Sequence, residues 1–94
     1  MKTVIVQIGN SDDKLPQKRW SEFVMGTDDL IQELADKVHF SGASGSAAPW
    51  QNACWVLMCD EVVLRDSLVP LLRNLADVFH QESIAVTIGD TRFI

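Results

Sequence analysis

The sequence predicts an α+β fold in which an antiparallel sheet carries two helices on one of its faces. Two segments repeat apolar residues at steps of three and four, the spacing of an amphipathic helix. Short runs rich in β-branched and aromatic residues lie around these segments and are typical of strands. One such run, residues 50–60, is apolar on both alternating faces, which favours a central strand of the sheet.

The first strand is expected at Lys2–Ile8, where β-branched residues are frequent, and it ends at the turn-forming cluster Gly9–Asp13. The first helix should follow from Pro16, because a proline costs little in a first helical turn. Gly26 falls on the polar side of that helix, where it should weaken the helix by about 1 kcal/mol. The apolar side should consist of Trp20, Phe23, Val24, Leu30, Ile31, Leu34, Ala35 and Val38.

A short strand is expected at Val38–Ser41, and a flexible loop over residues 41–49, which carry neither charge nor periodicity. The long central strand comes next, and its side chains should alternate between the two faces of the sheet. One face should hold Ala53, Trp55, Leu57 and Cys59, and the other Asn52, Cys54, Val56 and Met58.

The second helix is expected from the spacing of Leu64, Leu68, Leu71, Leu72, Leu75, Val78 and Phe79. Pro70 lies inside this pattern, where a proline ordinarily breaks a helix. If Asp66 or Ser67 is the N-cap, Pro70 falls in the first turn and is tolerated. Residues 61–65 would then form a separate turn or a bent beginning of the helix.

The chain closes with two strand-like runs, Ser83–Ile88 and Thr91–Ile94, separated by Gly89-Asp90. Glycine in the first position of a two-residue connection indicates a type II′ hairpin turn. The order is therefore β-α-β-β-α-β with a short C-terminal hairpin strand, in a single domain over residues 1–94. This order predicts a ferredoxin-like sandwich. An α/β layer with another strand order remains an alternative.

Composition limits the classes of function. The formal net charge of −5 and the pI near 4.7 argue against nucleic acid as a partner, because a phosphate-binding surface needs an excess of basic residues. No stretch approaches the apolar length of a membrane span, and no signal-peptide core follows the N-terminus, so a cytoplasmic protein without membrane contact is expected.

The two cysteines, Cys54 and Cys59, should be free thiols. On one strand they would point to opposite faces and lie roughly 16 Å apart, beyond the ~7 Å limit for a disulfide. Free buried thiols are typical of a reducing compartment.

Two groups of polar residues are candidates for binding a ligand or a partner. The first follows the first strand, at Gln7, Asn10, Ser11 and Asp12, because polar side chains and free backbone N–H groups converge at such corners. Turn and cap chemistry explains these residues equally well. The second group opens the long strand at Trp50, Gln51 and Asn52, where an indole and two amides could grip a base or a peptide. A core tryptophan with two satisfied turn amides is the alternative.

No catalytic residue, metal ligand or cofactor is assigned from the sequence. The spacings HxxxH and CxxC and the calcium-loop pattern are absent from it. Adjacent carboxylates such as Asp28 and Asp29 diverge by about 100° on a helix, so they do not form an acid–base pair.

A resemblance to known proteins rests on Val6–Leu15, Trp20, Pro49–Trp55 and the closing Ser-Ile-Ala-Val-Thr at residues 83–87. At these positions the chain resembles small uncharacterised ferredoxin-like proteins of bacterial and phage genomes. The resemblance covers most of the chain, from which Pro16 and the uncharged loop depart. It implies an accessory protein of a phage or mobile element that binds a host protein or a signal molecule, and it implies no activity.

The leading functional hypothesis is a non-enzymatic interaction protein. Two helices cover one face of a four-stranded sheet, so the other face would expose Cys54, Val56 and Met58 unless a partner covers them. That partner is expected to be a second copy, giving a homodimer, or a host protein. The alternative is a binding protein or enzyme for a small nucleotide-like signal, with its site at the polar corner after the first strand.

Overall fold

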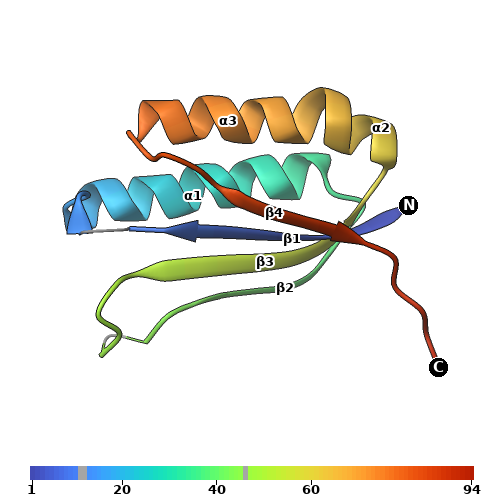
Figure 1. Cartoon of the computed structure of the whole chain (residues 1–94), viewed down its shortest axis with the longest axis horizontal. Helices are drawn as coiled ribbons and strands as arrows, with labels where there is room; N and C mark the ends of the chain where they lie inside the picture. Colours follow the sequence, from blue (N-terminus) through green and yellow to red (C-terminus); the bar gives the residue numbers. More distant parts are fainter. Residues whose placement is uncertain (11–12, 46) are drawn as a thin grey trace.

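A computed structural model describes residues 1–10, 13–45 and 47–94, and it shows two helical segments packed on one face of an antiparallel sheet (Figure 1). The expected α+β fold with an open antiparallel sheet is therefore confirmed. The strands are β1 (Lys2–Gly9), β2 (Lys37–Ala43), β3 (Asn52–Cys59) and β4 (Ala85–Gly89). The helical elements are α1 (Gln17–Leu34), α2 (Glu61–Val63), the π-helical turn η2 (Leu64–Leu68) and α3 (Val69–Val78). Among the described residues, no helix has both the length and the apolar character needed to cross a membrane.

The sheet has the strand order β2-β3-β1-β4, so β3 and β1 are its two central strands. All three pairings are antiparallel, with Val4 opposite Leu57 in the centre and Val6 opposite Val86 toward β4. The central position expected for the long apolar strand is confirmed. β2 and β4 form the two edges.

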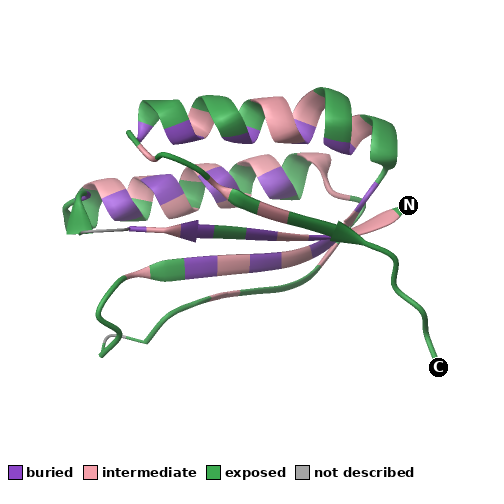
Figure 2. Ribbon diagram, in the orientation of Figure 1, coloured by how far each residue is buried: buried purple, intermediate pink, exposed green. Residues whose placement is uncertain are grey.

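The alternation expected along β3 is also confirmed. Ala53, Trp55, Leu57 and Cys59 are buried under the helices, while Cys54, Val56 and Met58 are half-buried on the opposite face. Figure 2 shows this banding along β3, beside a β2 strand that is exposed for most of its length. The described part of the chain therefore covers β3 fully on its helix side and leaves the opposite face partly open.

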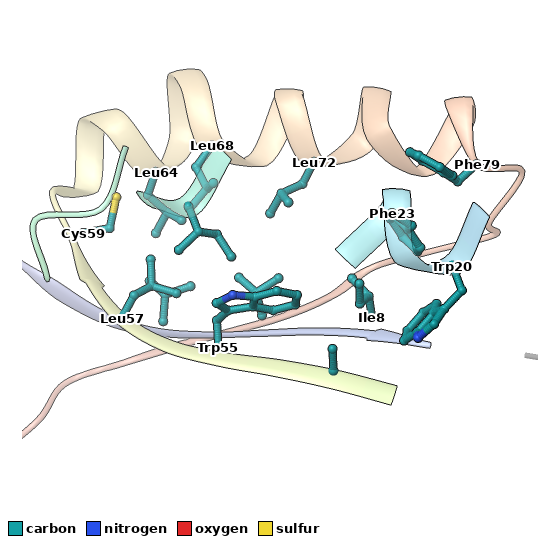
Figure 3. Close-up of a cluster of buried hydrophobic side chains, with 14 of the residues drawn as sticks. Ile8, Trp20, Phe23, Trp55, Leu57, Cys59, Leu64, Leu68, Leu72 and Phe79 are labelled. Atoms are coloured by element: carbon teal, nitrogen blue, oxygen red, sulfur yellow. The ribbon is translucent and has the colours of Figure 1, made fainter. Parts of the chain in front are cut away.

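The core lies between the helices and the helix-side face of β1 and β3 (Figure 3). Leu64, Leu68 and Leu72 descend from the second helical segment toward Leu57 and Trp55. Aromatic side chains fill one end of this layer. Phe23 stacks on Phe79 with ring centroids 4.9 Å apart, Trp20 meets Phe23 edge-on, and the Arg19 guanidinium lies 4.4 Å from the Phe79 centroid.

The first helix is shorter than the apolar spacing predicts. Ala35 has an extended backbone and ends α1, and the Asp36 N–H donates to the Met58 carbonyl at 2.9 Å. The chain from Asp36 onward therefore begins to pair with β3, so Val38 belongs to β2 rather than to the helix. β2 in turn continues to Ala43, two residues beyond the end expected for this strand at Ser41.

The position expected for Gly26 is wrong. Gly26 faces α3, and a Cβ atom there would lie 3.4 Å from Leu75 Cδ1. Position 26 therefore lies on the side of α1 that packs against α3, where a methyl group would make an ordinary contact. The apolar stripe of α1 did not reveal this contact, because a glycine adds nothing to the stripe.

The expected start of the second helix is also wrong. Asp60 is the N-cap, because its side chain accepts from the N–H groups of Val62 and Val63, and helical backbone then runs without a break to Val78. Pro70 therefore lies well inside the helical segment. The π-helical turn just before it inserts one extra residue per turn, which relieves the clash between a proline ring and the preceding carbonyls. The Val69 N–H closes that turn by donating to the Leu64 carbonyl.

The expected hairpin strand at the C-terminus is not formed, since residues 90–94 carry no strand in the structure. Gly89 does not adopt the positive φ that a type II′ turn requires. Instead, Lys2 Nζ lies 3.0 Å from Asp90 Oδ1, and the hydroxyls of Thr3 and Thr91 are hydrogen-bonded. These contacts with the start of β1 lead the tail past the sheet rather than back along β4 (Figure 1).

Candidate functional site

The face of the sheet opposite the helices carries three cross-strand rows of side chains, which we call the open face. Paired residues of antiparallel strands project to the same side, so the register defines the rows. They are Lys37–Met58–Thr3–Gly89, Phe40–Val56–Ile5–Thr87 and Gly42–Cys54–Gln7–Ala85. The middle row runs Phe40, Val56 and Ile5 side by side across three strands, which makes a continuous apolar band.

Phe40 is the most exposed residue of this band, with 58% of its surface accessible. Its ring bends over the backbone of Gly42, where a Cβ atom would come within 2.8 Å of the ring. A shallow hollow of about 340 Å³ lies beside the ring, and its lining includes Cys54, Gln7 and Asn52. The predicted interface residues Cys54, Val56 and Met58 therefore share one surface, together with Phe40 and Ile5, which the sequence did not single out. The register of β2 alone brings Phe40 to this face.

Asn10 is buried, and its side-chain amide is hydrogen-bonded to neighbouring residues of the same corner. Its Oδ1 accepts from the Leu15 N–H at 2.8 Å, and its Nδ2 donates to the Leu15 carbonyl at 2.8 Å and to Gln51 Oε1 at 3.1 Å. Its backbone N–H donates to the Gln51 carbonyl. Asn10 and Gln51 thus join the corner after β1 to the start of β3. These hydrogen bonds are those expected if Asn10 and Gln51 stabilise the turn.

The other predicted polar residues are more accessible. Trp50 is 55% exposed, and its carbonyl accepts from Asn52 Nδ2 at 3.1 Å. The Asn52 N–H donates to Ser44 Oγ at 2.9 Å, which closes the connection between β2 and β3. Ser11 and Asp12, also predicted for this site, lie outside the described residues.

Gln7 and Asn52 also reach a polar cleft of about 340 Å³ at the end of β1. Its opposite wall comes from the segment before β4, which the sequence did not connect with this corner. Lys14 and Glu82 place one positive and one negative charge in the lining, and Gln81 and Ser83 add further polar groups. Only the strand order could have revealed this wall, because it sets the start of β4 beside the end of β1.

The two cysteines are free, as expected, with Cys54 half-buried and Cys59 buried. Burial raises the pKa of the Cys59 thiol, and the negative charges of Asp36 and Asp60 raise it further. The thiol also donates to the Leu34 carbonyl at 3.8 Å. A raised pKa keeps Cys59 protonated at neutral pH, which opposes a nucleophilic role.

No protein-family model matches this chain, and no curated protein matches it. The assignment of a site therefore depends on the geometry alone. Within residues 1–10, 13–45 and 47–94, no three His, Cys, Asp or Glu side chains gather closely enough to hold a metal ion.

A third surface, which the sequence did not indicate, is the groove between α1 and β2. Its volume is about 430 Å³, and its floor includes Trp55 and Ala53. Met25, which is 61% exposed, and the carboxylates of Asp28 and Asp29 form the helix side. Asp28 is fixed in place because its Oδ1 accepts from Trp55 Nε1 at 2.9 Å. Ser41 and Ala43 form the β2 side of this α1–β2 groove.

Proposed function

We propose that this protein is a non-enzymatic interaction module that forms a homodimer through the open face of its sheet. The observation that carries the proposal is the band of Phe40, Val56 and Ile5, flanked by Cys54 and Met58. The four aliphatic and thiol side chains are half-buried by their own neighbours, and Phe40 is largely exposed. Covering such a band with a partner removes apolar surface from water, at about 25 cal/mol per Å².

A second copy is favoured as the partner by the distribution of charge. The chain has a net charge of −5, so two copies repel each other in most orientations. The three rows of the open face contain Lys37 but no carboxylate. Two copies that meet through this face therefore keep their acidic groups apart and desolvate few charges. A host protein, as the likeness to phage and mobile-element proteins implies, is the other occupant that the experiment below can reveal.

We also infer that the fold is the ferredoxin-like sandwich. Support comes from the strand order β2-β3-β1-β4 with antiparallel neighbours, in which β3 separates the two strands joined by α1. This is the split βαβ arrangement. A reducing compartment such as the cytoplasm agrees with the two free cysteines, one of which is half-exposed on the open face.

A small-ligand function is the second candidate, and the polar cleft beside Gln7 and Asn52 favours it. Lys14 and Glu82 offer one cation and one anion across a volume of about 340 Å³. A polar molecule carrying both charges, or a nucleotide-like signal held through Lys14, fits this chemistry. Asn10 does not line this cleft, and its amide is hydrogen-bonded to Leu15 and Gln51.

Sedimentation equilibrium at micromolar concentration tests the dimer. The wild-type protein should sediment at twice its chain mass of 10.5 kDa. Val56→Glu places a charge in the centre of the band and should give a folded monomer. Val78→Glu is the matched control, because Val78 is 58% exposed on α3, away from the sheet, and this variant should remain a dimer.

Two results would contradict the proposal. One is a wild-type mass near 10.5 kDa, and the other is a Val56→Glu protein that is folded and keeps the dimer mass. Native mass spectrometry of protein purified from its host adds a readout for the second candidate. A retained small molecule would favour the polar cleft, and a retained host protein would replace the second copy as occupant of the open face.

A further inference from the structure

The outer edge of β2 presents backbone hydrogen-bonding groups that no other described strand pairs with. β2 is seven residues long, lies at the end of the strand order and is exposed on most of its length. Lys37 and His39 lie near its beginning, and a register irregularity separates Val38 from Phe40. Charges and bulges of this kind discourage edge pairing at that end. Residues 40–43 carry neither a charge nor a proline.

The register shows which groups of this segment point outward. The Ser44 N–H donates to the Asn52 carbonyl at 2.8 Å, in line with the pairing of Gly42 with Cys54 and of Phe40 with Val56. Hydrogen-bonded positions alternate in an antiparallel pair. The N–H and C=O groups of Ser41 and Ala43 are therefore directed away from β3, toward the free edge.

A strand that pairs with Ser41 and Ala43 would send two side chains into the α1–β2 groove. Ser41 lies opposite Trp55, and Ala43 lies opposite Ala53, so both face the helix side of the sheet. Residues of an added strand directly opposite Ser41 and Ala43 project to the same side. The small side chains of Ser41, Ala43 and Ala53 leave the groove open to receive them, with a volume of about 430 Å³.

The chemistry of the groove selects a basic side chain for these two positions. Asp28 and Asp29 line it, and neither forms a salt bridge with a cation among the described residues. Met25, which is largely exposed, provides apolar surface next to the carboxylates, and Trp55 is also part of the lining. Arginine and lysine combine an apolar stem with a charged head, so they match both features. A second copy fits less well, because its β2 offers the uncharged Ser41 and Ala43 along this segment.

We propose that the β2 edge binds an extended peptide segment of a partner protein by strand addition, with arginine or lysine at two alternate positions over Asp28 and Asp29. Main-chain hydrogen bonds to Ser41 and Ala43 give the affinity, and the α1–β2 groove gives the preference for basic residues. This surface is separate from the open face, so the two proposals can fail independently.

Fluorescence anisotropy with a labelled peptide of alternating valine and arginine, seven residues long by design, tests the edge. The wild-type protein should bind this probe more weakly at high salt, because the arginine–carboxylate attraction is screened. A matched peptide with glutamate in place of arginine should bind at least about tenfold more weakly. Hydrogen exchange at the amides of Ser41 and Ala43 should slow when the arginine peptide is present.

Variants of the protein separate the contribution of the β2 backbone to peptide binding from the contribution of the two carboxylates. Ser41→Pro removes an outward N–H without removing a β2–β3 hydrogen bond, and it should weaken binding at least about tenfold. The double change Asp28→Asn with Asp29→Asn should weaken binding and flatten its salt dependence. Asp77→Asn, an exposed carboxylate on α3, is the control and should leave binding unchanged.

If Ser41→Pro fails to fold, Ala43→Arg is the second variant, because its side chain fills the groove with a fixed cation. It should prevent binding of the arginine peptide while its thermal unfolding remains like that of the wild-type protein. The proposal is overturned if the wild-type protein binds neither peptide up to about 1 mM. Equal binding of the two peptides also overturns it. Undiminished binding by folded Ser41→Pro, or by folded Ala43→Arg, would show that the probe does not add to β2. Val56→Glu should bind the probe like wild type, which keeps this test apart from that of the dimer.

Discussion

The indole of Trp55 and the carboxylate of Asp28 connect the central strand β3 to the middle of α1. Trp55 Nε1 donates to Asp28 Oδ1 at 2.9 Å, while the ring itself is buried against the core. Asp28 is half-buried and receives a weaker contact from Gln32 at 3.4 Å. The pair fixes the wall of the α1–β2 groove and satisfies the one polar atom of a buried tryptophan.

Replacing Asp28 with alanine should lower the free energy of unfolding by about 1–2 kcal/mol, because the buried indole N–H loses a charged acceptor. Asp29→Ala is the matched control, because this exposed neighbour makes no comparable bond with the described residues, and it should stay within about 0.5 kcal/mol. Denaturant unfolding followed by tryptophan fluorescence measures both. Equal stability of the two variants would show that the indole bond contributes nothing.

Asn10→Ala should destabilise the fold by about 1–3 kcal/mol, since the Leu15 N–H and carbonyl both lose their partner. Asn10→Asp should not restore stability, because the carboxylate accepts from the Leu15 N–H but places a buried negative charge against the Leu15 carbonyl and Gln51 Oε1. Asn52→Ala, which removes an exposed bond to the Trp50 carbonyl, should cost no more than about 1 kcal/mol. Thermal melts give the order of the three. A fully stable Asn10→Ala protein would show that these hydrogen bonds contribute little to stability and would favour the predicted ligand-binding role of Asn10.

Asp60→Ala should cost about 1 kcal/mol, because the N–H groups of Val62 and Val63 lose the side chain that caps them. Ser67→Ala should be neutral or slightly stabilising, since alanine has the higher helix propensity and Ser67 lies within η2 rather than at a cap. Urea unfolding of both variants distinguishes the two N-cap assignments. The reverse order of stabilities would support a helix that begins near Ser67.

Gly26→Ala should raise the free energy of unfolding by about 0.5–1 kcal/mol. The added methyl group improves helix propensity and reaches Leu75 at 3.4 Å, an ordinary contact distance. Gly26→Leu should destabilise the protein instead, because the larger side chain forces α1 and α3 apart. If both changes stabilise, Gly26 faces solvent in solution.

Cys54 should react with a thiol reagent before Cys59 does at neutral pH. Cys54 is half-buried on the open face, whereas Cys59 is buried and its pKa is raised, which lowers its thiolate fraction. Mass spectrometry of the native protein over time should show one rapid and one slow modification, and denaturant should make both rapid. The labelling should be followed at several protein concentrations, because the proposed dimer would cover Cys54 and slow its reaction. First labelling at Cys59 would contradict the placement of the two thiols.

The alternation of apolar and polar side chains along each strand was enough to predict much of the fold. Val4, Val6 and Ile8 face the core as their spacing in β1 predicts, and the same holds for Trp55 and Leu57 in β3. Burial on one side of a strand leaves a period of two that can be recognised without any tertiary information. The predicted interface on Cys54, Val56 and Met58 followed from the same alternation, and its role stays a prediction.

Features that depend on distant contacts were not recoverable in this way. Pro70 is tolerated inside the helix because of a π-helical turn, and no local pattern distinguishes such a turn from a broken helix. The tail after Gly89 follows contacts with Lys2 and Thr3, at the other end of the chain. The role of Asn10 depends on Gln51, which the fold brings beside it. The α1–β2 groove required knowledge of which strand lies at the edge.

The strand order also determines when the sheet can be completed during synthesis. Thr3 lies opposite Gly89 and Gln7 opposite Ala85, so the pairing of β1 with β4 closes a loop that contains almost the whole chain. Such distant pairs pay a large entropy cost before they gain any contact, which slows folding. A nascent chain that has formed β1, β2 and β3 keeps one side of β1 unpaired until β4 has left the ribosome. Throughout that interval a central strand of the finished sheet is an exposed edge, where another chain could pair with it.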